Sequence, residues 1–147
     1  MVIDKATADD IEVISELIGE IEEHYGGKRV PGDPEQIKSA LFGDRPAATV
    51  LLGRDETDVV GLASFSLLWP AAGAESSLYL KELFVRVPHR RKGVASAFME
   101  RLRQEAVARG CSRVEWTADR DNLAALAFYQ ALGAQPHRGK VLYRTAP

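Results

Sequence analysis

The chain has 147 residues, of which 46% are apolar and 27% are charged, and its formal net charge is −2. This length and balance exclude a disordered or fibrous protein and predict one soluble globular domain over residues 1–147. A slightly negative chain without a long apolar run is expected to bind neither nucleic acid nor a membrane as a whole.

Two helices are predicted in the first third of the chain. Thr7 is a capping residue, and apolar side chains then recur at helical spacing, which predicts an amphipathic helix over roughly residues 8–24. Asp33 followed by Pro34 is a typical helix start and predicts a short second helix that includes Leu41. The glycines and prolines between them predict a mobile joint.

A hairpin and a third strand are predicted next. The β-rich runs 49–52 and 59–68 flank the polar turn 54–58, as expected for a hairpin. The run 78–85 is also a strand, but its apolar side chains do not alternate cleanly. That irregularity is compatible with a bulge or with burial on both faces.

The second half alternates helices and strands. It predicts a helix over 93–109, a strand over 113–118, a helix over 122–132 and a last strand over 141–144. This order favours an α/β fold in which helices pack against a sheet with a parallel central pair.

A basic turn, Val87–Ala95, joins the third predicted strand to the following helix. Gly93 and Ala95 let a ligand approach the backbone, and the free N–H groups of a helix start suit a diphosphate. Cations surround the turn: Arg86, His89, Arg90, Arg91 and Lys92. A basic loop that merely solvates a helix start is the alternative, but the position between strand and helix favours an anion site.

Two stretches resemble signatures of one enzyme family. Arg90, Gly93 and Ala95 match the coenzyme A-binding motif of GNAT acetyltransferases, Q/R-x-x-G-x-G/A, and the segment 122–134 resembles their N-x-x-A-x-x-F-Y-x-x-x-G-F/A signature. The resemblance implies the GNAT (acyl-CoA N-acyltransferase) fold, a mixed central sheet with a splayed parallel strand pair flanked by helices. It also implies acetyl-coenzyme A as co-substrate and a homodimer formed through the C-terminal strand.

The resemblance also implies which residues bind the co-substrate. Main-chain groups of Phe84 and Val85 would pair with the pantetheine arm as an added strand would. Asn122 would contact the coenzyme arm, and Tyr129 would lie near its sulfur. The pyrophosphate would be held by the turn and helix start, namely Arg90, Arg91, Lys92, Gly93, Val94, Ala95 and Ser96.

Tyr129 and Glu82 are the candidate catalytic residues. A phenol with a pKa of about 10 can protonate a leaving thiolate, which makes Tyr129 a candidate general acid, although core packing is the alternative for a tyrosine on an apolar helix. Glu82 could accept the proton of the amine or hold the ammonium group. Its alternative is a surface glutamate paired with Lys81.

These residues indicate an enzyme that transfers an acetyl group to a primary amine of a small molecule or protein by direct attack on the thioester. The alternative is a non-catalytic sensor that binds acyl-coenzyme A. Similarity to diamine and polyamine acetyltransferases, and the acidic residues Glu20, Glu22 and Glu23, suit a polycationic acceptor, whereas Lys81 would repel a second amine. The acceptor stays open.

Cysteine and histidine usage completes the expectations. The only cysteine, Cys111, cannot form an intrachain disulfide, and no charged leader with an apolar core begins the chain, so a cytoplasmic protein is predicted. His24, His89 and His137 show no ligand spacing with Cys111, so no metal is expected.

Overall fold

A five-stranded sheet in the order β1-β2-β3-β4-β5 organises residues 1–116. The structure, a computed structural model, describes residues 1–147 and divides them into two compact units, Met1–Trp116 and Thr117–Pro147. Neighbouring strands are antiparallel except β4 and β5, which are parallel. The strands are β1 (Val2–Lys5), β2 (Thr49–Arg54), β3 (Val59–Leu68), β4 (Ser77–Val85) and β5 (Arg113–Trp116). The mixed sheet with one parallel pair is the predicted fold class.

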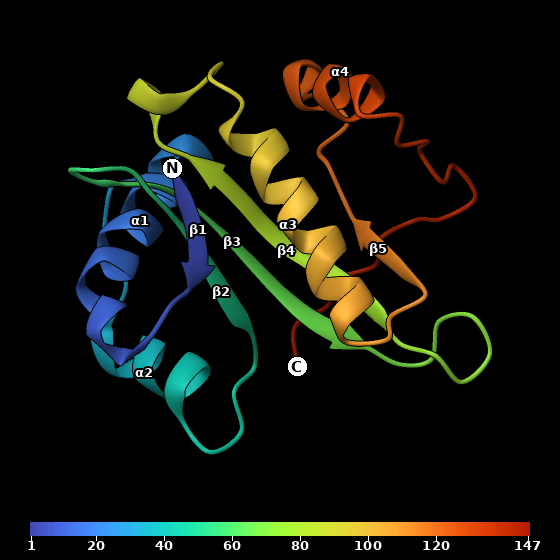
Figure 1. Cartoon of the computed structure of the whole chain (residues 1–147), viewed down its shortest axis with the longest axis horizontal. Helices are drawn as coiled ribbons and strands as arrows, with labels where there is room; N and C mark the ends of the chain where they lie inside the picture. Colours follow the sequence, from blue (N-terminus) through green and yellow to red (C-terminus); the bar gives the residue numbers. More distant parts are fainter. The chain divides into compact units, whose positions relative to one another are not determined.

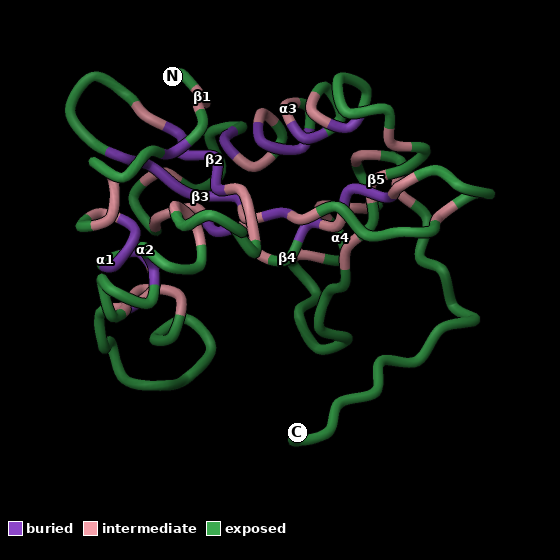
Figure 2. Tube along the Cα trace, turned by 90° about the horizontal axis from the view of Figure 1, so that it is seen from below, coloured by how far each residue is buried: buried purple, intermediate pink, exposed green.

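Helices lie on both faces of this sheet. In the first unit they are α1 (Ile11–His24), α2 (Pro34–Phe42) and α3 (Val94–Ala108), with the short 3₁₀ turns η1 (Ala8–Asp10) and η2 (Val87–His89). Figure 1 shows the strands of this unit side by side, and Figure 2 shows α3 on one side of the sheet with α1 and α2 on the other. None of the helices has the length and apolar composition needed to cross a bilayer.

The predicted helix starts are confirmed by their capping hydrogen bonds. The Thr7 N–H donates to Asp10 Oδ2 at 2.8 Å, which with the Thr7 side chain completes a capping box. The Glu35 N–H donates to Asp33 Oδ1 at 2.9 Å at the start of α2. The joint between the helices is tied to α1, because the Gly32 N–H donates to the Ser15 carbonyl at 3.0 Å.

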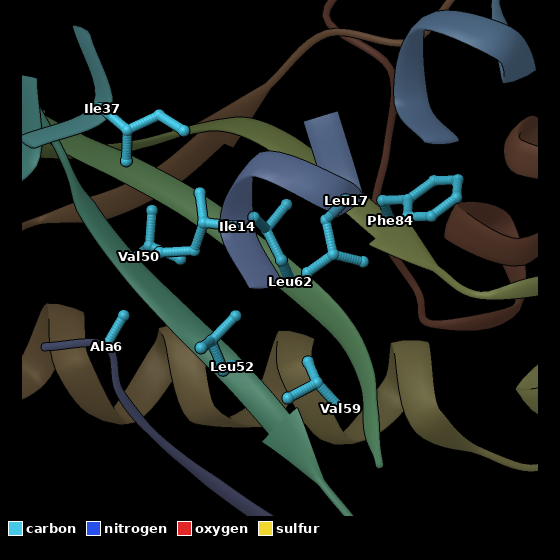
Figure 3. Close-up of a cluster of buried hydrophobic side chains, with 9 residues drawn as sticks. All are labelled: Ala6, Ile14, Leu17, Ile37, Val50, Leu52, Val59, Leu62 and Phe84. Atoms are coloured by element: carbon cyan, nitrogen blue, oxygen red, sulfur yellow. The ribbon is translucent and has the colours of Figure 1, made fainter. Parts of the chain in front are cut away.

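The core on the α1 and α2 face joins both helices to the sheet. Ile14 and Leu17 of α1 are almost fully buried, and Figure 3 shows them projecting among Val50 and Leu62 of the strands. Along a strand alternate side chains face opposite sides, so Leu51 and Gly53 face α3 instead. A Cβ at Gly53 would meet the Phe98 ring at 3.1 Å, which shows how closely α3 approaches.

Strand β4 contains the irregularity that its sequence indicates. Ser64 of β3 pairs with Glu82, whereas the next residue, Phe65, pairs with Leu80. Lys81 is therefore one extra residue in β4, a β-bulge. The bulge lets Leu80 and Glu82 face opposite sides of the sheet although one residue separates them.

The sequence-based prediction missed one strand and was wrong about another. β1 was not predicted, because four residues are too short to show an alternating pattern; it is recognised only by its pairing with β2 from Val2–Arg54 to Lys5–Leu51. The strand predicted over 141–144 does not form, and residues 135–147 carry neither helix nor strand. Its composition favours a strand, but a strand also requires a hydrogen-bonding partner.

The second unit contains one helix, α4 (Leu123–Ala131). Asn122 caps it, since Asn122 Oδ1 accepts a hydrogen bond from the Ala125 N–H at 3.2 Å. Gly133 follows the helix with φ +82°, the left-handed conformation that favours glycine after a helix. The predicted helix and its closing glycine are both present.

Candidate active site

The predicted anion cradle is an exposed turn followed by the first turn of α3. Arg91 and Gly93 have positive φ angles of 60° and 81°, and α3 begins directly after Gly93. The first N–H groups of a helix have no intrahelical acceptor, so those of Val94, Ala95 and Ser96 are available to an anion. A Cβ at Gly93 would meet nothing within 4 Å, so space for a ligand lies beside the backbone.

The predicted cradle residues differ in exposure. Arg90, Arg91, Lys92, Gly93 and Ser96 are exposed, Ala95 is half-buried, and Val94 is buried. The buried Val94 side chain anchors the helix start in the core, so only its N–H group can serve a ligand. The remaining side chains present three cations to solvent around the free N–H groups.

Arg86 does not belong to the cradle, contrary to the sequence-based expectation. Its guanidinium contacts Asp58 at 2.8 Å and Glu20 at 3.0 Å, and it donates to the Val59 carbonyl. Burial by itself would lower the pKa of Arg86, but the hydrogen bonds and charges of Glu20 and Asp58 outweigh burial and raise it. Arg86 therefore stays charged and joins α1, the β2–β3 turn and the end of β4.

His89 is also directed at carboxylates. Its ring nitrogens lie 3.7 Å from Asp55 and 3.9 Å from Asp58. Asp55 in turn caps the hairpin turn, accepting from the Thr57 and Asp58 N–H groups at 3.0 and 2.8 Å. The cations that surround the cradle are thus Arg90, Arg91 and Lys92.

One edge of β4 is open beyond the bulge. Pairing with β5 ends at Leu80–Trp116, while β4 continues to Val85. The Arg86 N–H donates to the Val60 carbonyl of β3 at 2.9 Å. In an antiparallel pair the main-chain groups of every second residue point toward the neighbouring strand, so those of Leu83 and Val85 point away from β3. The splayed parallel pair therefore exposes main-chain groups of these two residues.

This alternation changes one predicted contact. The main-chain groups of Phe84 face β3, and a Cβ at Gly61 of β3 would collide with the Phe84 carbonyl oxygen. Leu83, which no sequence motif marks, takes the outward position beside Val85. The alternation along β4 could have identified it, had the bulge position been known.

Arg90 contacts the same open edge. Its Nε donates to the Val85 carbonyl at 2.8 Å, and its guanidinium lies 5.5 Å from the centre of the Phe84 ring. The first residue of the cradle thereby holds the turn against the end of β4.

Glu82 lies on the face of β4 that is turned toward α1 and α2, in the wall of a pocket. The pocket has a volume of about 410 Å³ and is bounded by α1, α2 and the sheet. The Tyr25 hydroxyl donates to Glu82 Oε1 at 3.1 Å, which orients the carboxylate. No local sequence pattern links Tyr25 to a residue 57 positions away.

The acidic cluster at the end of α1 is divided among three tasks. Glu20 pairs with Arg86, and Glu23 lies 3.4 Å from Arg29. Glu22 lines the pocket, together with Asp33 before α2. A continuous acidic rim is therefore not formed by these residues.

Asn122 and Tyr129 belong to the second unit. The side-chain oxygen of Asn122, Oδ1, caps α4, which leaves the side-chain NH₂ group to donate hydrogen bonds. Tyr129 is half-buried, and its ring centre lies 5.2 Å from that of Phe128. Glu82, the open edge and the cradle all belong to the first unit.

No three His, Cys, Asp or Glu side chains come together as a group that could hold a metal ion. Cys111 is a half-buried free thiol. That the protein needs no metal stays a prediction.

Comparison with known proteins identifies the family. Residues 15–134 match the model described as the acetyltransferase (GNAT) family. The chain is 35% identical over 77 residues to an L-ornithine N5-acetyltransferase of Arabidopsis thaliana, a match that covers 52% of this chain and 34% of the plant protein. It is 26% identical over 144 residues to a thialysine N-epsilon-acetyltransferase of Bos taurus, covering 92% of this chain and 84% of the bovine one.

A solved structure agrees over the whole length. An integron cassette protein from the mobile metagenome of V. cholerae superimposes with a TM-score of 0.82 and 26% identity, covering 99% of this chain and 92% of the other. The resemblance drawn from the cradle motif and the 122–134 signature is thus confirmed. The chain belongs to the acetyltransferase (GNAT) family, whose members are acyltransferase enzymes.

Proposed function

We propose that the protein is an acetyl-coenzyme A-dependent N-acetyltransferase that acts on a primary amine of a small molecule or protein. The observation that carries the proposal is the arrangement along β4. Its open edge, with outward groups of Leu83 and Val85, is followed along the chain by η2 and then by the exposed helix start at Gly93, while Glu82 on the same strand lines a pocket. A donor site and an acceptor site thus share one strand.

The residues fit acetyl-coenzyme A, which supplies the acetyl group as a thioester. The helix-start N–H groups and the cations of Arg90, Arg91 and Lys92 would hold its pyrophosphate. The outward main-chain groups of Leu83 and Val85 would pair with its pantetheine arm. Arg90 now donates to the Val85 carbonyl, so it would release this acceptor when the arm binds.

Glu82 and Tyr129 are proposed to move the protons. An amine is protonated in water and must lose a proton before it attacks, and Glu82 is the carboxylate in the pocket wall that could accept it. The Tyr25 hydroxyl holds Glu82 Oε1 at 3.1 Å and would keep the carboxylate oriented. Tyr129 would donate a proton to the leaving sulfur, and Asn122 would contact the coenzyme arm.

Thiol release from acetyl-coenzyme A with a panel of primary amines tests the proposal. We expect amine-dependent release by the wild-type chain. Glu82→Gln and Tyr129→Phe should each lower kcat by about 10²-fold or more, the range for a proton-transfer group, while coenzyme A affinity changes less than about threefold. Ser112→Ala, on a surface loop, is the control and should resemble wild type.

The outcomes separate the alternatives. Coenzyme A binding without amine-dependent release would favour a sensor of acyl-coenzyme A over an enzyme. Equal losses of kcat and coenzyme affinity in Tyr129→Phe would assign Tyr129 to packing.

We further propose that the chain is one domain that forms a homodimer in the cytoplasm. Val141, Leu142 and Tyr143 are 74%, 68% and 89% exposed, and the resemblance to related enzymes suggests that this apolar segment meets a second copy. A sedimentation mass of about twice 16.1 kDa would support the dimer.

A further inference from the structure

The pocket that Glu82 lines has a mostly aliphatic wall with a few polar groups. Most of its lining is aliphatic and comes from α1, α2 and the sheet, with Ile18, Ile21, Leu41 and Leu62 as examples. Its volume of about 410 Å³ lies within the usual range of small-molecule sites, roughly 300–1,000 Å³. A small organic molecule would therefore meet mainly hydrocarbon there.

The polar groups of the lining fall into two sets. Glu82 and its cross-strand partner Ser64 lie on the sheet and are half-buried. Glu22, Asp33 and Gln36 come from the helices and the joint, and all three are exposed. A charge inside the pocket would thus meet a half-buried carboxylate at the sheet, and other acidic groups only where the pocket opens to solvent.

This distribution favours an acceptor with one charged end. A buried ammonium requires a partner, and Glu82 supplies one. A second ammonium along aliphatic walls would lose water without gaining a hydrogen bond, whereas methylene groups there would gain free energy by leaving water. The apolar lining therefore favours binding of acceptors with longer aliphatic chains and disfavours acceptors with a second charge.

We propose that this pocket selects a primary amine carried on an aliphatic body, with the amine at Glu82 and the body against α1 and α2. The inference rests on the proposed acetyltransferase function and specifies its acceptor. Apolar length, and not a second positive charge, sets the preference among acceptors.

A ladder of acceptors tests the inference on the full chain with acetyl-coenzyme A. From propylamine to hexylamine, kcat/KM should rise about fourfold per added methylene, the fold-change that corresponds to ~0.8 kcal/mol per buried CH₂. At equal length, 1,6-diaminohexane should be at least ~10-fold poorer than hexylamine, because its second charge meets aliphatic walls.

Two matched variants locate the effect. Leu41→Asn places a polar group of similar size in the pocket wall. It should reduce the rise in kcat/KM to less than about twofold per added methylene. Val107→Asn makes the same kind of change on α3, where Val107 is 80% exposed and outside the pocket. This variant should show the wild-type rise in kcat/KM per added methylene. Thermal melting of both variants verifies that they fold.

The contrary results are distinct. The inference would be overturned if kcat/KM of the wild-type chain did not rise with amine length, or if the diamine had a higher kcat/KM than the monoamine of equal length. Either result would leave the proposed acetyltransferase function intact. An unchanged ladder in folded Leu41→Asn would also overturn it, since the selecting surface would then lie elsewhere. Absence of thiol release with every amine of the broad panel would refute the proposed function, and this inference with it.

Discussion

Gly93 combines two properties that a ligand site for phosphate requires. Its φ of +81° is a conformation that L side chains adopt with strain, and no atom lies within 4 Å of the position where a Cβ would stand. The positive φ sets the direction of the free N–H groups at the start of α3, and the open space would admit the proposed pyrophosphate. A side chain here would affect both.

Substitution of Gly93 should separate strain from charge. Gly93→Ala adds strain of about 1 kcal/mol and should weaken coenzyme A binding modestly, whereas Gly93→Glu adds bulk and a like charge beside the pyrophosphate and should lower affinity by at least ~100-fold. Titration calorimetry with coenzyme A measures both.

Gly73 provides the matched control. It also has a positive φ, +59°, with nothing within 4 Å, but it lies in the loop between β3 and β4. Gly73→Glu should therefore bind coenzyme A as wild type does. Unchanged affinity in folded Gly93→Glu would remove the cradle from the site.

At the scale of elements, α3 is joined to the sheet and to its own last turn by one ionic cluster. Glu105 contacts Arg101 at 2.8 Å and Arg109 at 3.2 Å, and Arg101 also donates to the Ile3 carbonyl of β1. Burial alone would raise the pKa of Glu105, but the hydrogen bonds and charges of Arg101 and Arg109 outweigh it and hold the pKa below 4.5.

The lowered pKa makes this contribution depend on pH. A carboxyl whose pKa is lower in the folded chain stabilises that state fully above its unfolded pKa, near 4.5, and less as pH falls through the lower value. Glu105→Gln should cost about 1 kcal/mol near pH 7, or ~3 °C in Tm, and the difference from wild type should shrink as pH falls below about 4.

A neighbouring pair on the same helix provides the comparison. Glu100 lies 3.7 Å from Arg103, and both side chains are more than half exposed. Glu100→Gln should therefore change Tm little at either pH, since exposed ion pairs contribute little. A Glu105→Gln deficit that persists undiminished at pH 3 would contradict the linkage.

The sequence predicts elements that carry local signals. Thr7, Asp33 and Asn122 mark helix starts by the chemistry of their side chains, and the structure has their capping bonds. β1 carries no such signal, because its identity depends on pairing with β2. The segment 141–144 shows the converse, an apolar composition without a partner strand.

The site divides in the same way. The cradle is a contiguous motif, so its residues can be proposed from the sequence alone, and their binding of coenzyme A stays a prediction. Arg86 was misassigned because a basic residue beside a basic turn gives no sign of Glu20 and Asp58, which approach from α1 and the hairpin turn. Leu83 and Tyr25 depend on strand register and on a contact between distant residues, which no local pattern contains.

At the scale of the whole molecule, a single domain predicts a single unfolding transition. α4 has nine residues, none of them buried, and isolated helices shorter than about 12–15 residues are marginal in water. If residues 1–147 are one cooperative domain, the amides of α4 and of β3 should lose hydrogen-exchange protection at the same urea concentration. Peptide-resolved mass spectrometry measures this. Two separated midpoints would indicate two independently unfolding parts.

The extra residue in β4 sets a trade-off for the entire fold. Lys81 interrupts the pairing of β4 with β3 at the point where β5 stops pairing with β4. The outward main-chain groups of Leu83 and Val85 therefore have no hydrogen bonds to β5. A chain with Lys81 deleted would have a regular β3–β4 ladder, with Leu80 and Glu82 still on their present faces. Loss of the bulge should stabilise the sheet and disturb the edge of β4 along which pantetheine is proposed to lie. Stability and acetyl transfer would then respond in opposite directions to the loss of one codon.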